Sequence, residues 1–390
     1  GWMATSAGLH RLLLFYRERA NARIAAKKKF IVARLGDLLL ATACFLLVEA
    51  YSTTHIGTIL ERAGEATDAG ALGRASTAAA VLMAIAAALK SAQFPTHSWL
   101  LEVMETPTPV SALLHAGIIN AGGFLVLRFA NVFALESASL GILAAVGAFT
   151  ALFGSLAMLC QTSVKGSLAY STVGQMGFML LECGVGAFGA ALIHLVAHSL
   201  YKAHAFLASG SAVTAMRPLA PPVDGAKPSR ILLGLATAAA LVLCVAYYGG
   251  AEGSIGALIV LFAVLSLSLG HYLIASSAGG GLLSFLRAAT VAAALAAIFV
   301  ALHRVGDELL AGFVQASSAS PLALGAAGLA VASFALVVVA QAAFGSEAGV
   351  SPMAQRAYVA MKHGLYANTL MSRWVGAWKR PSSLHPSSHD

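Results

Sequence analysis

The stretch from Ala138 to Cys160 reads ASLGILAAVGAFTALFGSLAMLC and contains no charged side chain. A helix rises about 1.5 Å per residue, so about 20 apolar residues cross the hydrocarbon core of a bilayer. The stretch shows no alternation of polar and apolar residues, which a strand of a membrane barrel would need. It therefore predicts a transmembrane helix.

The rest of the chain repeats this pattern. Its 390 residues are 59% hydrophobic and 10% charged, whereas an ordinary soluble domain carries about 25% charged residues. We predict an all-α polytopic membrane helix bundle with about eleven spans, which excludes a soluble enzyme, a fibre and a disordered chain. The predicted spans are 1–16, 30–51, 75–100, 108–129, 138–160, 165–183, 186–209, 230–249, 254–276, 282–303 and 320–344.

The net charge of +8 reflects membrane orientation and not a nucleic-acid partner. Segment 17–29 carries six basic residues and one acidic residue, whereas segment 52–74 is richer in carboxylates. Basic connections stay in the cytoplasm. Alternation from 17–29 then places the carboxyl terminus in the cytoplasm.

Two stretches depart from plain spans. Gln93-Phe94-Pro95 interrupts the run 75–100, where Pro95 removes a helix hydrogen bond. Unwound backbone at membrane depth occurs only where protein or a wet cavity surrounds it. The second stretch, 346–379, is amphipathic and basic, so we expect it along the cytoplasmic surface or against a partner.

Ionisable residues inside spans are functional candidates, because each costs from about 3 to above 10 kcal/mol in a bilayer. Lys90 precedes the Pro95 interruption, and His115 lies in mid-span. Buried lysines and histidines can carry protons. The alternatives are a lysine that reaches the interface and a histidine bonded to a backbone carbonyl.

The densest signal is His194-Leu195-Val196-Ala197-His198-Ser199-Leu200-Tyr201-Lys202. A spacing of four places His194, His198 and Lys202 on one helix face. Three such groups cannot all face lipid, so they predict an interior path. A zinc site is the competing interpretation, although no HExxH glutamate accompanies the histidines.

Other charged residues have two interpretations each. Lys165 belongs to the same row or anchors its span at the interface. Arg34 and Asp37, three residues apart, form an ion pair that is structural or that biases the charge of Lys90. Glu102 flanks a proton entrance or is a solvated loop carboxylate.

Several motifs resemble the antiporter-like subunits of respiratory NADH–quinone oxidoreductase. They are Lys90-Ser91-Ala92-Gln93-Phe94-Pro95, Pro107-Thr108-Pro109-Val110-Ser111-Ala112-Leu113-Leu114-His115-Ala116, Leu168-Ala169-Tyr170-Ser171-Thr172-Val173-Gly174-Gln175-Met176-Gly177, and the run from His194 to Ser211. The resemblance covers residues 1–215 well and implies proton translocation on broken helices. It matches Lys90 with the central lysine, and the bridging residues with His115, Lys165, His194, His198 and Lys202. Accessory residues would be Arg34, Asp37, Glu102 and Tyr170.

The chain departs from that pattern at two places. The family usually has a Trp-Glu pair whose carboxylate pairs with the central lysine, and Trp2-Met3 stands at the matching position. The span 230–249 has no charge after Arg230, and no long lateral helix follows the last span. These features, with Leu9-His10-Arg11 and the compact tail around His363-Gly364-Leu365-Tyr366, are most similar to the DabB family, the membrane subunits of DAB inorganic-carbon accumulation complexes.

That second resemblance implies a partner and a coupled reaction. In the DabB family the partner, DabA, is a peripheral protein resembling a zinc β-carbonic anhydrase. Proton or sodium flow through the membrane subunit would drive CO2 hydration there. The resemblance implies a non-enzymatic chain in the bacterial cytoplasmic (inner) membrane, with zinc in the partner and no cofactor or metal in this chain. The alternatives are a respiratory or hydrogenase pump subunit, a sodium/proton antiporter subunit, and a passive scaffold.

The same comparison predicts three parts. Residues 1–215 form the proton-relay core, 216–345 form divergent membrane spans, and 346–390 form the amphipathic basic tail. Because the chain opens at Gly1-Trp2-Met3 directly in an apolar run, we expect further spans to precede it in the natural protein.

Overall fold

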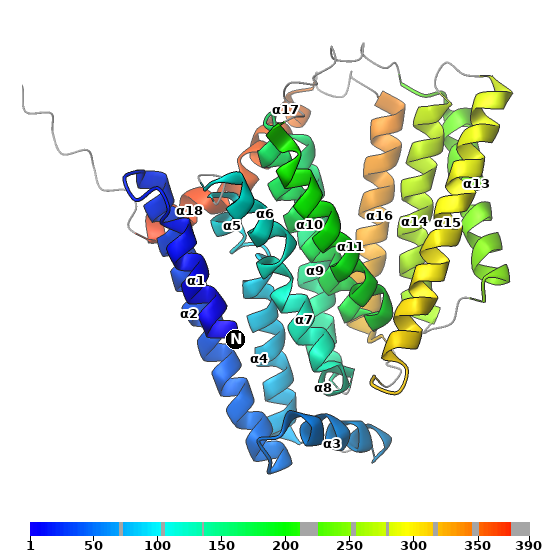
Figure 1. Cartoon of the computed structure of the whole chain (residues 1–390). Coiled ribbons are helices and arrows are strands. Elements are labelled where there is room, and N and C mark those ends of the chain that lie inside the picture. Colours follow the sequence, from blue (N-terminus) through cyan, green and yellow to red (C-terminus); the bar gives the residue numbers. More distant parts are fainter. Residues whose placement is uncertain are drawn as a thin grey trace, which may run out of the picture.

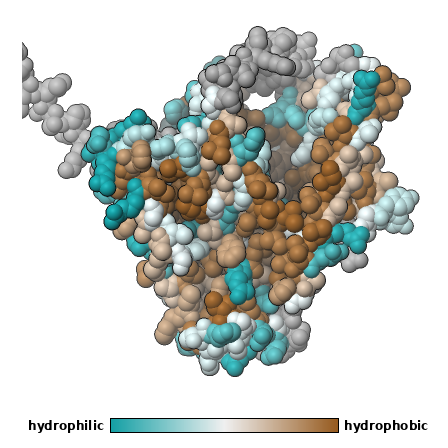
Figure 2. Space-filling view, in the orientation of Figure 1, coloured by the Kyte–Doolittle hydropathy of each residue, from teal (hydrophilic) through white to brown (hydrophobic). Residues whose placement is uncertain are grey.

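The computed structural model describes residues 1–69, 73–102, 106–134, 136–210, 225–250, 255–277, 281–314, 319–344 and 351–375. All regular secondary structure within these ranges is helical, so the all-α prediction is confirmed. Most long helices run side by side, while α3 (Ile56–Ala69) lies across one end of the bundle (Figure 1). Apolar side chains cover much of the middle of the visible face (Figure 2).

Every predicted span coincides with a helix or a broken helix. The first group comprises α1 (Trp2–Leu13), α2 (Ala20–Tyr51), α4 (Arg74–Lys90), α5 (Ser98–Glu102), α6 (Thr108–Ala116), α7 (Ala121–Arg128), α8 (Ala130–Ala134), α9 (Ser137–Leu159), α10 (Val164–Gly184) and α11 (Phe188–Leu207). The second comprises α13 (Pro228–Tyr248), α14 (Ile255–Ser276), α15 (Leu282–Leu310) and α16 (Pro321–Phe344). Seven helices of the described residues, counting α6 and α7 as one, have the length and hydropathy of a membrane span.

Glycines bring α9 and α10 into backbone contact. A Cβ atom on Gly147 would lie 2.6 Å from the carbonyl oxygen of Gly177. One on Gly177 would lie 2.5 Å from the backbone nitrogen of Ala151. Membrane helices lack a hydrophobic driving force between them, so close approach at small residues supplies their packing energy. These positions fix α9 against α10, which carries several candidate residues.

The predicted interruption near Pro95 is present. The α4 helix ends at Lys90 and α5 begins at Ser98, with turns between them. The segment packs inside the protein, where Ser91 and Gln93 are both buried. Lys90 therefore lies at a helix end inside the bundle.

The predicted span 108–129 is present but is not one continuous helix, because the helix breaks at Gly117. A 3₁₀ turn (Ile118–Asn120) separates α6 from α7. The Asn120 amide donates to the carbonyl of Ala116 at 2.8 Å. Gly122 lies so close to α4 that a Cβ atom would overlap the carbonyl oxygen of Ala87. The break places His115 beside a helix end.

Segment 17–29 also differs from its prediction as a basic connection. The α2 helix begins at Ala20, so most of the segment is helical. Lys28 and Lys29 are buried, with 0% and 4% of their surfaces exposed. Both amines have partners inside the protein, which a pattern of charges cannot reveal.

The described part of the tail forms α17 (Pro352–Lys362), a 3₁₀ turn (Gly364–Tyr366) and α18 (Ala367–Trp374). It lies at the end of the bundle opposite α3 (Figure 1). The Lys27 ammonium donates to the carbonyl of Val375 at 2.9 Å, and the Gln161 amide donates to that of Lys362 at 3.3 Å. The tail is therefore fastened to the ends of α2 and α9.

Candidate functional site: a chain of buried protonatable residues

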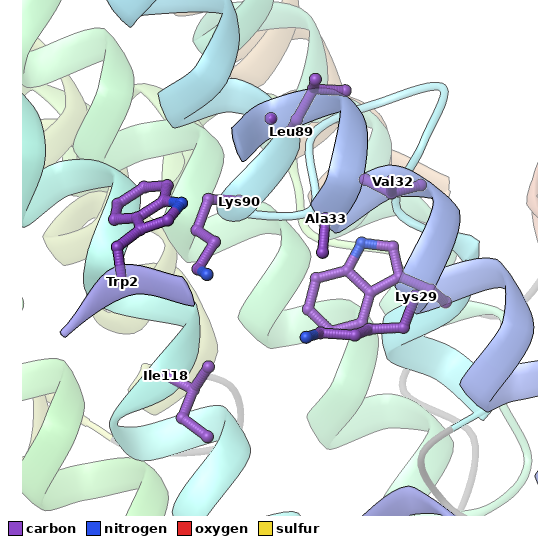
Figure 3. A pocket seen from close by; sticks show the side chains of 9 residues that line it. Trp2, Lys29, Val32, Ala33, Leu89, Lys90 and Ile118 are labelled. Carbon is purple, nitrogen blue, oxygen red and sulfur yellow. The ribbon is translucent and has the colours of Figure 1, made fainter. Parts of the chain in front are cut away.

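Lys90 occupies a pocket between α1, α2 and α4. Its ammonium donates a 2.7 Å hydrogen bond to the hydroxyl of Ser6 and lies 4.3 Å from the centre of the Trp2 ring. Figure 3 shows the lysine side chain beside this ring. Met3 is 53% exposed, whereas Ser6 is buried. The partner of Lys90 on α1 is therefore a neutral hydroxyl.

A second lysine and a carboxylate share the Lys90 pocket region. The Lys29 ammonium donates to the carbonyl of Ser6 at 2.9 Å. Asp37 is buried and lies 2.5 Å from the guanidinium of Arg34, which forms the predicted local pair. Both lysines lie within electrostatic range of Asp37. One carboxylate thus faces three cationic groups.

His115 is fully buried at the end of α6. Its Nδ1 atom lies 3.0 Å from the hydroxyl of Thr172 on α10. The ring stacks on Phe206 with 4.3 Å between ring centres. Among the described residues, its Nε2 atom has no hydrogen-bond partner. The tautomer is set by Thr172, which also donates to the Leu168 carbonyl at 3.1 Å.

His198 and Lys202 of α11 join His115 in the interior. Both are buried, Lys202 completely. The Lys202 ammonium donates to the carbonyl of Leu168 at 3.2 Å, and both ring nitrogens of His198 have no hydrogen-bond partner in the part of the chain that the structure describes. The three residues lie within electrostatic range of one another. The structure therefore brings together three predicted residues from two helices.

The row continues from His198 to a carboxylate that the sequence analysis missed. The rings of His194 and His198 lie 6.2 Å apart, centre to centre. His194 Nδ1 lies 2.8 Å from the carboxylate of Glu182, which is buried on α10. Glu182 is the only acidic residue in the predicted span 165–183. A single carboxylate inside a predicted membrane span could have identified Glu182 as a candidate from the sequence.

Lys165 lies apart from the deeply buried residues. It stands in the first turn of α10, is partly exposed, and donates to the hydroxyl of Thr108 at 3.1 Å. Thr108 begins α6, so this bond joins two helix ends. The structure therefore places Lys165 where the first turns of α6 and α10 meet.

Glu102 forms a shielded ion pair at the end of α5. Its carboxylate lies 2.5 Å from the ammonium of Lys28, and the exposed fraction of its side chain is 17%. Lys28 also donates to the amide oxygen of Asn368 in the tail at 2.6 Å. The solvated-loop alternative for Glu102 is therefore wrong. The ion pair connects α2 with α5, and the bond from Lys28 to Asn368 connects both helices with α18.

Tyr170 packs in an aromatic cluster with Phe153, at 6.1 Å between ring centres. The cluster includes His97, which the sequence analysis did not select. Within the described ranges, no group of three or more His, Cys, Asp or Glu side chains is arranged to hold a metal ion. His194 instead takes Glu182 as its partner.

The family described as "NADH:quinone oxidoreductase/Mrp antiporter, TM" matches residues 1–278. The chain belongs to this family. It is a multi-pass membrane protein and an antiporter-like subunit, so the family resemblance noted from the motifs is confirmed.

Individual relatives fall into two kinds. The probable inorganic carbon transporter subunit DabB2 of Halothiobacillus neapolitanus is 39% identical over 384 residues, covering 96% of this chain and 67% of the relative. NADH-quinone oxidoreductase subunit L of Pseudomonas aeruginosa is 40% identical over 216 residues, covering 55% of this chain and 35% of that one. The resemblance to DabB subunits is confirmed, and it extends through both helix groups.

Among solved structures, a chain of the Mrp complex from Dietzia sp. DQ12-45-1b has a TM-score of 0.50 and 25% identity. The match covers 96% of this antiporter-like chain and 42% of the Mrp chain. The chain therefore spans only part of the length of each of these proteins. That Mrp chain is one member of a complex.

Proposed function

We propose that this chain conducts protons, or sodium ions, as the membrane subunit of an inorganic-carbon accumulation complex. Ion flow would drive CO2 hydration and bicarbonate accumulation in a peripheral, DabA-like partner that resembles a carbonic anhydrase and holds zinc. One observation carries the ion-conduction part, namely the buried group of His115, His198 and Lys202 inside membrane helices. The relative DabB2, matched over 96% of the chain, supports the carbon-accumulation part.

The proposed path has three stations. The first is the Lys90 pocket, where Ser6 orients the ammonium and Asp37 supplies the nearby negative charge. The second is the His115, His198 and Lys202 group. The third is the Glu182–His194 pair. Each station contains a group that can hold a proton and a neighbouring group that changes its proton affinity.

The histidines suit proton transfer for a geometric reason. Thr172 occupies Nδ1 of His115, and the unengaged Nε2 can accept or release a proton. Buried polar atoms in proteins are normally satisfied by protein or by water. Water molecules would therefore bridge the gaps between His115, His198 and Lys202.

The donor set favours protons over sodium. Sodium, a hard cation, would need several oxygen ligands. The middle station instead presents the nitrogen atoms of His115, His198 and Lys202. Carboxylates lie only at the ends of the path, at Asp37 and Glu182.

The catalytic chemistry would belong to the partner. Carbon dioxide hydration on zinc requires a metal-bound water, and we assign that site to the DabA-like protein. We place this chain in the bacterial inner membrane with its tail in the cytoplasm, because the basic segments 17–29 and 351–375 lie at the same end. The tail exposes Trp374, Leu370 and Arg373, and we assign these side chains to the surface that would bind the partner.

The second candidate is a proton-pumping subunit of a respiratory complex or a cation/proton antiporter. The 40% identity to subunit L favours it. Against it stands the neutral Ser6 as the α1 partner of Lys90, where the respiratory pattern has a carboxylate on this helix. Co-purification separates the two. A zinc-containing soluble partner without flavin or iron–sulfur proteins supports carbon accumulation, and redox subunits would overturn it.

Growth of cells that depend on the complex tests the path. We expect Lys90→Ala and His115→Ala complexes to assemble but to fail to support growth at air-level CO2. The matched control is His271→Ala on α14, an exposed histidine of another membrane helix. Normal growth of both path variants would contradict the assignment.

A further inference from the structure

His97 lies between α4 and α5 in an aromatic enclosure. Its ring stacks on Phe94 at 5.6 Å between centres, meets the edge of Phe153 at 4.9 Å, and lies 6.3 Å from Tyr170. The side chain is completely buried. Neither ring nitrogen has a hydrogen-bond partner among residues within the described ranges.

Burial of the His97 imidazole without a hydrogen-bond partner lowers the stability of the folded protein. A buried polar group without a partner destabilises the folded state by about 1–3 kcal/mol. Leucine or phenylalanine would fill the same enclosure without that cost. An imidazole retained there is therefore expected to bind water or to carry a proton, as intramembrane ionisable residues generally do.

The 3₁₀ turn of the tail covers this enclosure. A Cβ atom on Gly364 would overlap the hydroxyl of Tyr170 and lie 3.7 Å from Nε2 of His97. Only a glycine allows the turn to come this close. The turn thus separates His97 and Tyr170 from the surface on which the tail lies.

The backbone of the turn is strained. Gly364, Leu365 and Tyr366 have φ angles of 58°, 51° and 59°. Left-handed conformations cost non-glycine residues about 1 kcal/mol or more each. Such residues persist only when surrounding contacts hold them, so release of those contacts favours opening of the turn.

The contacts that hold the turn connect it to the ion pair between Lys28 and Glu102. Beyond Gly364, the Ser98 hydroxyl bonds the Met371 sulfur at 2.9 Å, and Lys28 bonds Asn368 at 2.6 Å. Lys28 is also the partner of Glu102. Breaking the Lys28–Glu102 pair would therefore alter the position of α18, and with it the contacts that hold the turn.

We propose that His97 is a further proton-carrying residue, and that the Gly364–Tyr366 turn is a cover that controls access to it from the tail side. The proton-carrying role rests on the proposed conduction of protons by this chain. The cover does not, because solvent access to His97 can be measured without any ion flow.

Solvent access is measured on the full complex with a single reporter. Cys44, Cys160 and Cys244 are replaced by serine, His97→Cys is introduced, and a membrane-impermeant maleimide is added. Cys183 stays, because its burial makes it a reference for intact folding. Gly364→Ala should raise the labelling rate at position 97 by about tenfold or more, because local opening then becomes more frequent.

Gly312→Ala is the matched control. Gly312 also has a positive φ, of 83°, but a Cβ atom there meets nothing within 4 Å. It therefore introduces the same type of backbone strain without displacing the tail. Equal labelling rates in the two glycine variants would overturn the proposal that the turn controls access to His97.

Proton flux into proteoliposomes containing the full complex tests His97 itself. His97→Phe, which suits the aromatic enclosure, should lower the flux by about a hundredfold, at the lower end of the range for loss of one proton-transferring group. Unchanged flux in His97→Phe, with flux abolished in Lys90→Ala, would overturn the role of His97 and leave the proposed function standing. Unchanged flux in both would contradict the proposed function.

Discussion

The helices α1–α11 and α13–α16 have interiors of different chemistry, although both groups cross the same membrane. The interior of the first contains lysines, histidines and carboxylates. A core of the second consists of Ala238, Val242, Leu269, Leu273, Ala288, Ala292 and Ala296. The described exception is His303, which lies 3.4 Å from Asp307 one turn later.

This difference shows that the buried ionisable residues are not needed for helix packing. Both groups use small residues to bring helices together, as lipid gives no hydrophobic drive between them. The second group shows that such packing needs no buried charge. The ionisable residues of the first group are therefore not required to hold a bundle, and their cost points to ion movement.

The largest expected effect concerns packing in the first group. Gly177→Val places side-chain carbons where the backbone of Ala151 lies, and α9 must separate from α10. We expect a loss of at least about 3 kcal/mol in stability, at the upper end for overpacking. The thermal denaturation midpoint of the purified complex measures it.

Gly325→Val is the control in the second group. A Cβ atom on this α16 glycine meets nothing within 4 Å, so its midpoint should stay near that of the unmodified protein. Similar losses in both variants would show that the effect reflects helix propensity and not contact.

The next effect concerns charge in the two interiors. Lys202→Met keeps the length of the buried side chain but removes its proton, so proton flux should fall by about a hundredfold. His303→Leu removes the ionisable residue buried in α15, and flux should stay within about twofold because His303 lies outside the proposed path. Fluorescence of a pH dye trapped in proteoliposomes measures both. Equal flux losses would break the contrast between the two groups.

Much of the fold was predictable because span length and hydropathy are local properties. All eleven predicted ranges coincide with helices, and Pro95 marked one break. The break at Gly117 was missed, since it depends on the approach of Gly122 to α4, a contact between distant segments. The start of the second helix at Ala20 was also missed, because Lys28 and Lys29 bind partners elsewhere in the chain.

The site shows the same limit. Spacing placed His194, His198 and Lys202 on one face of α11, and the position of His115 in the middle of a predicted span singled out that residue. No spacing rule could join Glu182 to His194, because the two belong to different helices. His97 was equally hidden, because its significance comes from the tail that covers it, far along the chain.

A moderate effect is expected at Glu182. Glu182→Ala leaves His194 without the carboxylate at 2.8 Å, and losing a hydrogen bond to a charged group costs about 1.5–3 kcal/mol. We expect about a tenfold lower proton flux, which is equivalent to about 1.4 kcal/mol. Glu182→Gln keeps a hydrogen-bond acceptor, so its proton flux should lie between that of Glu182→Ala and that of the unmodified protein. A Gln variant as impaired as Ala would indicate that charge and not orientation matters.

The smallest effect is expected where one carboxylate faces several cations. Asp37→Asn removes the negative charge near Lys29, Arg34 and Lys90, which we expect to lower proton flux about fivefold, equivalent to about 1 kcal/mol. Ser6→Asp should restore flux, because the Ser6 side chain already touches the Lys90 ammonium at 2.7 Å. Met3→Glu should not, since position 3 is 53% exposed. Rescue by Met3→Glu and not by Ser6→Asp would mean that Lys90 turns toward the position where related subunits carry glutamate, so the carboxylate would act from α1 and not from α2.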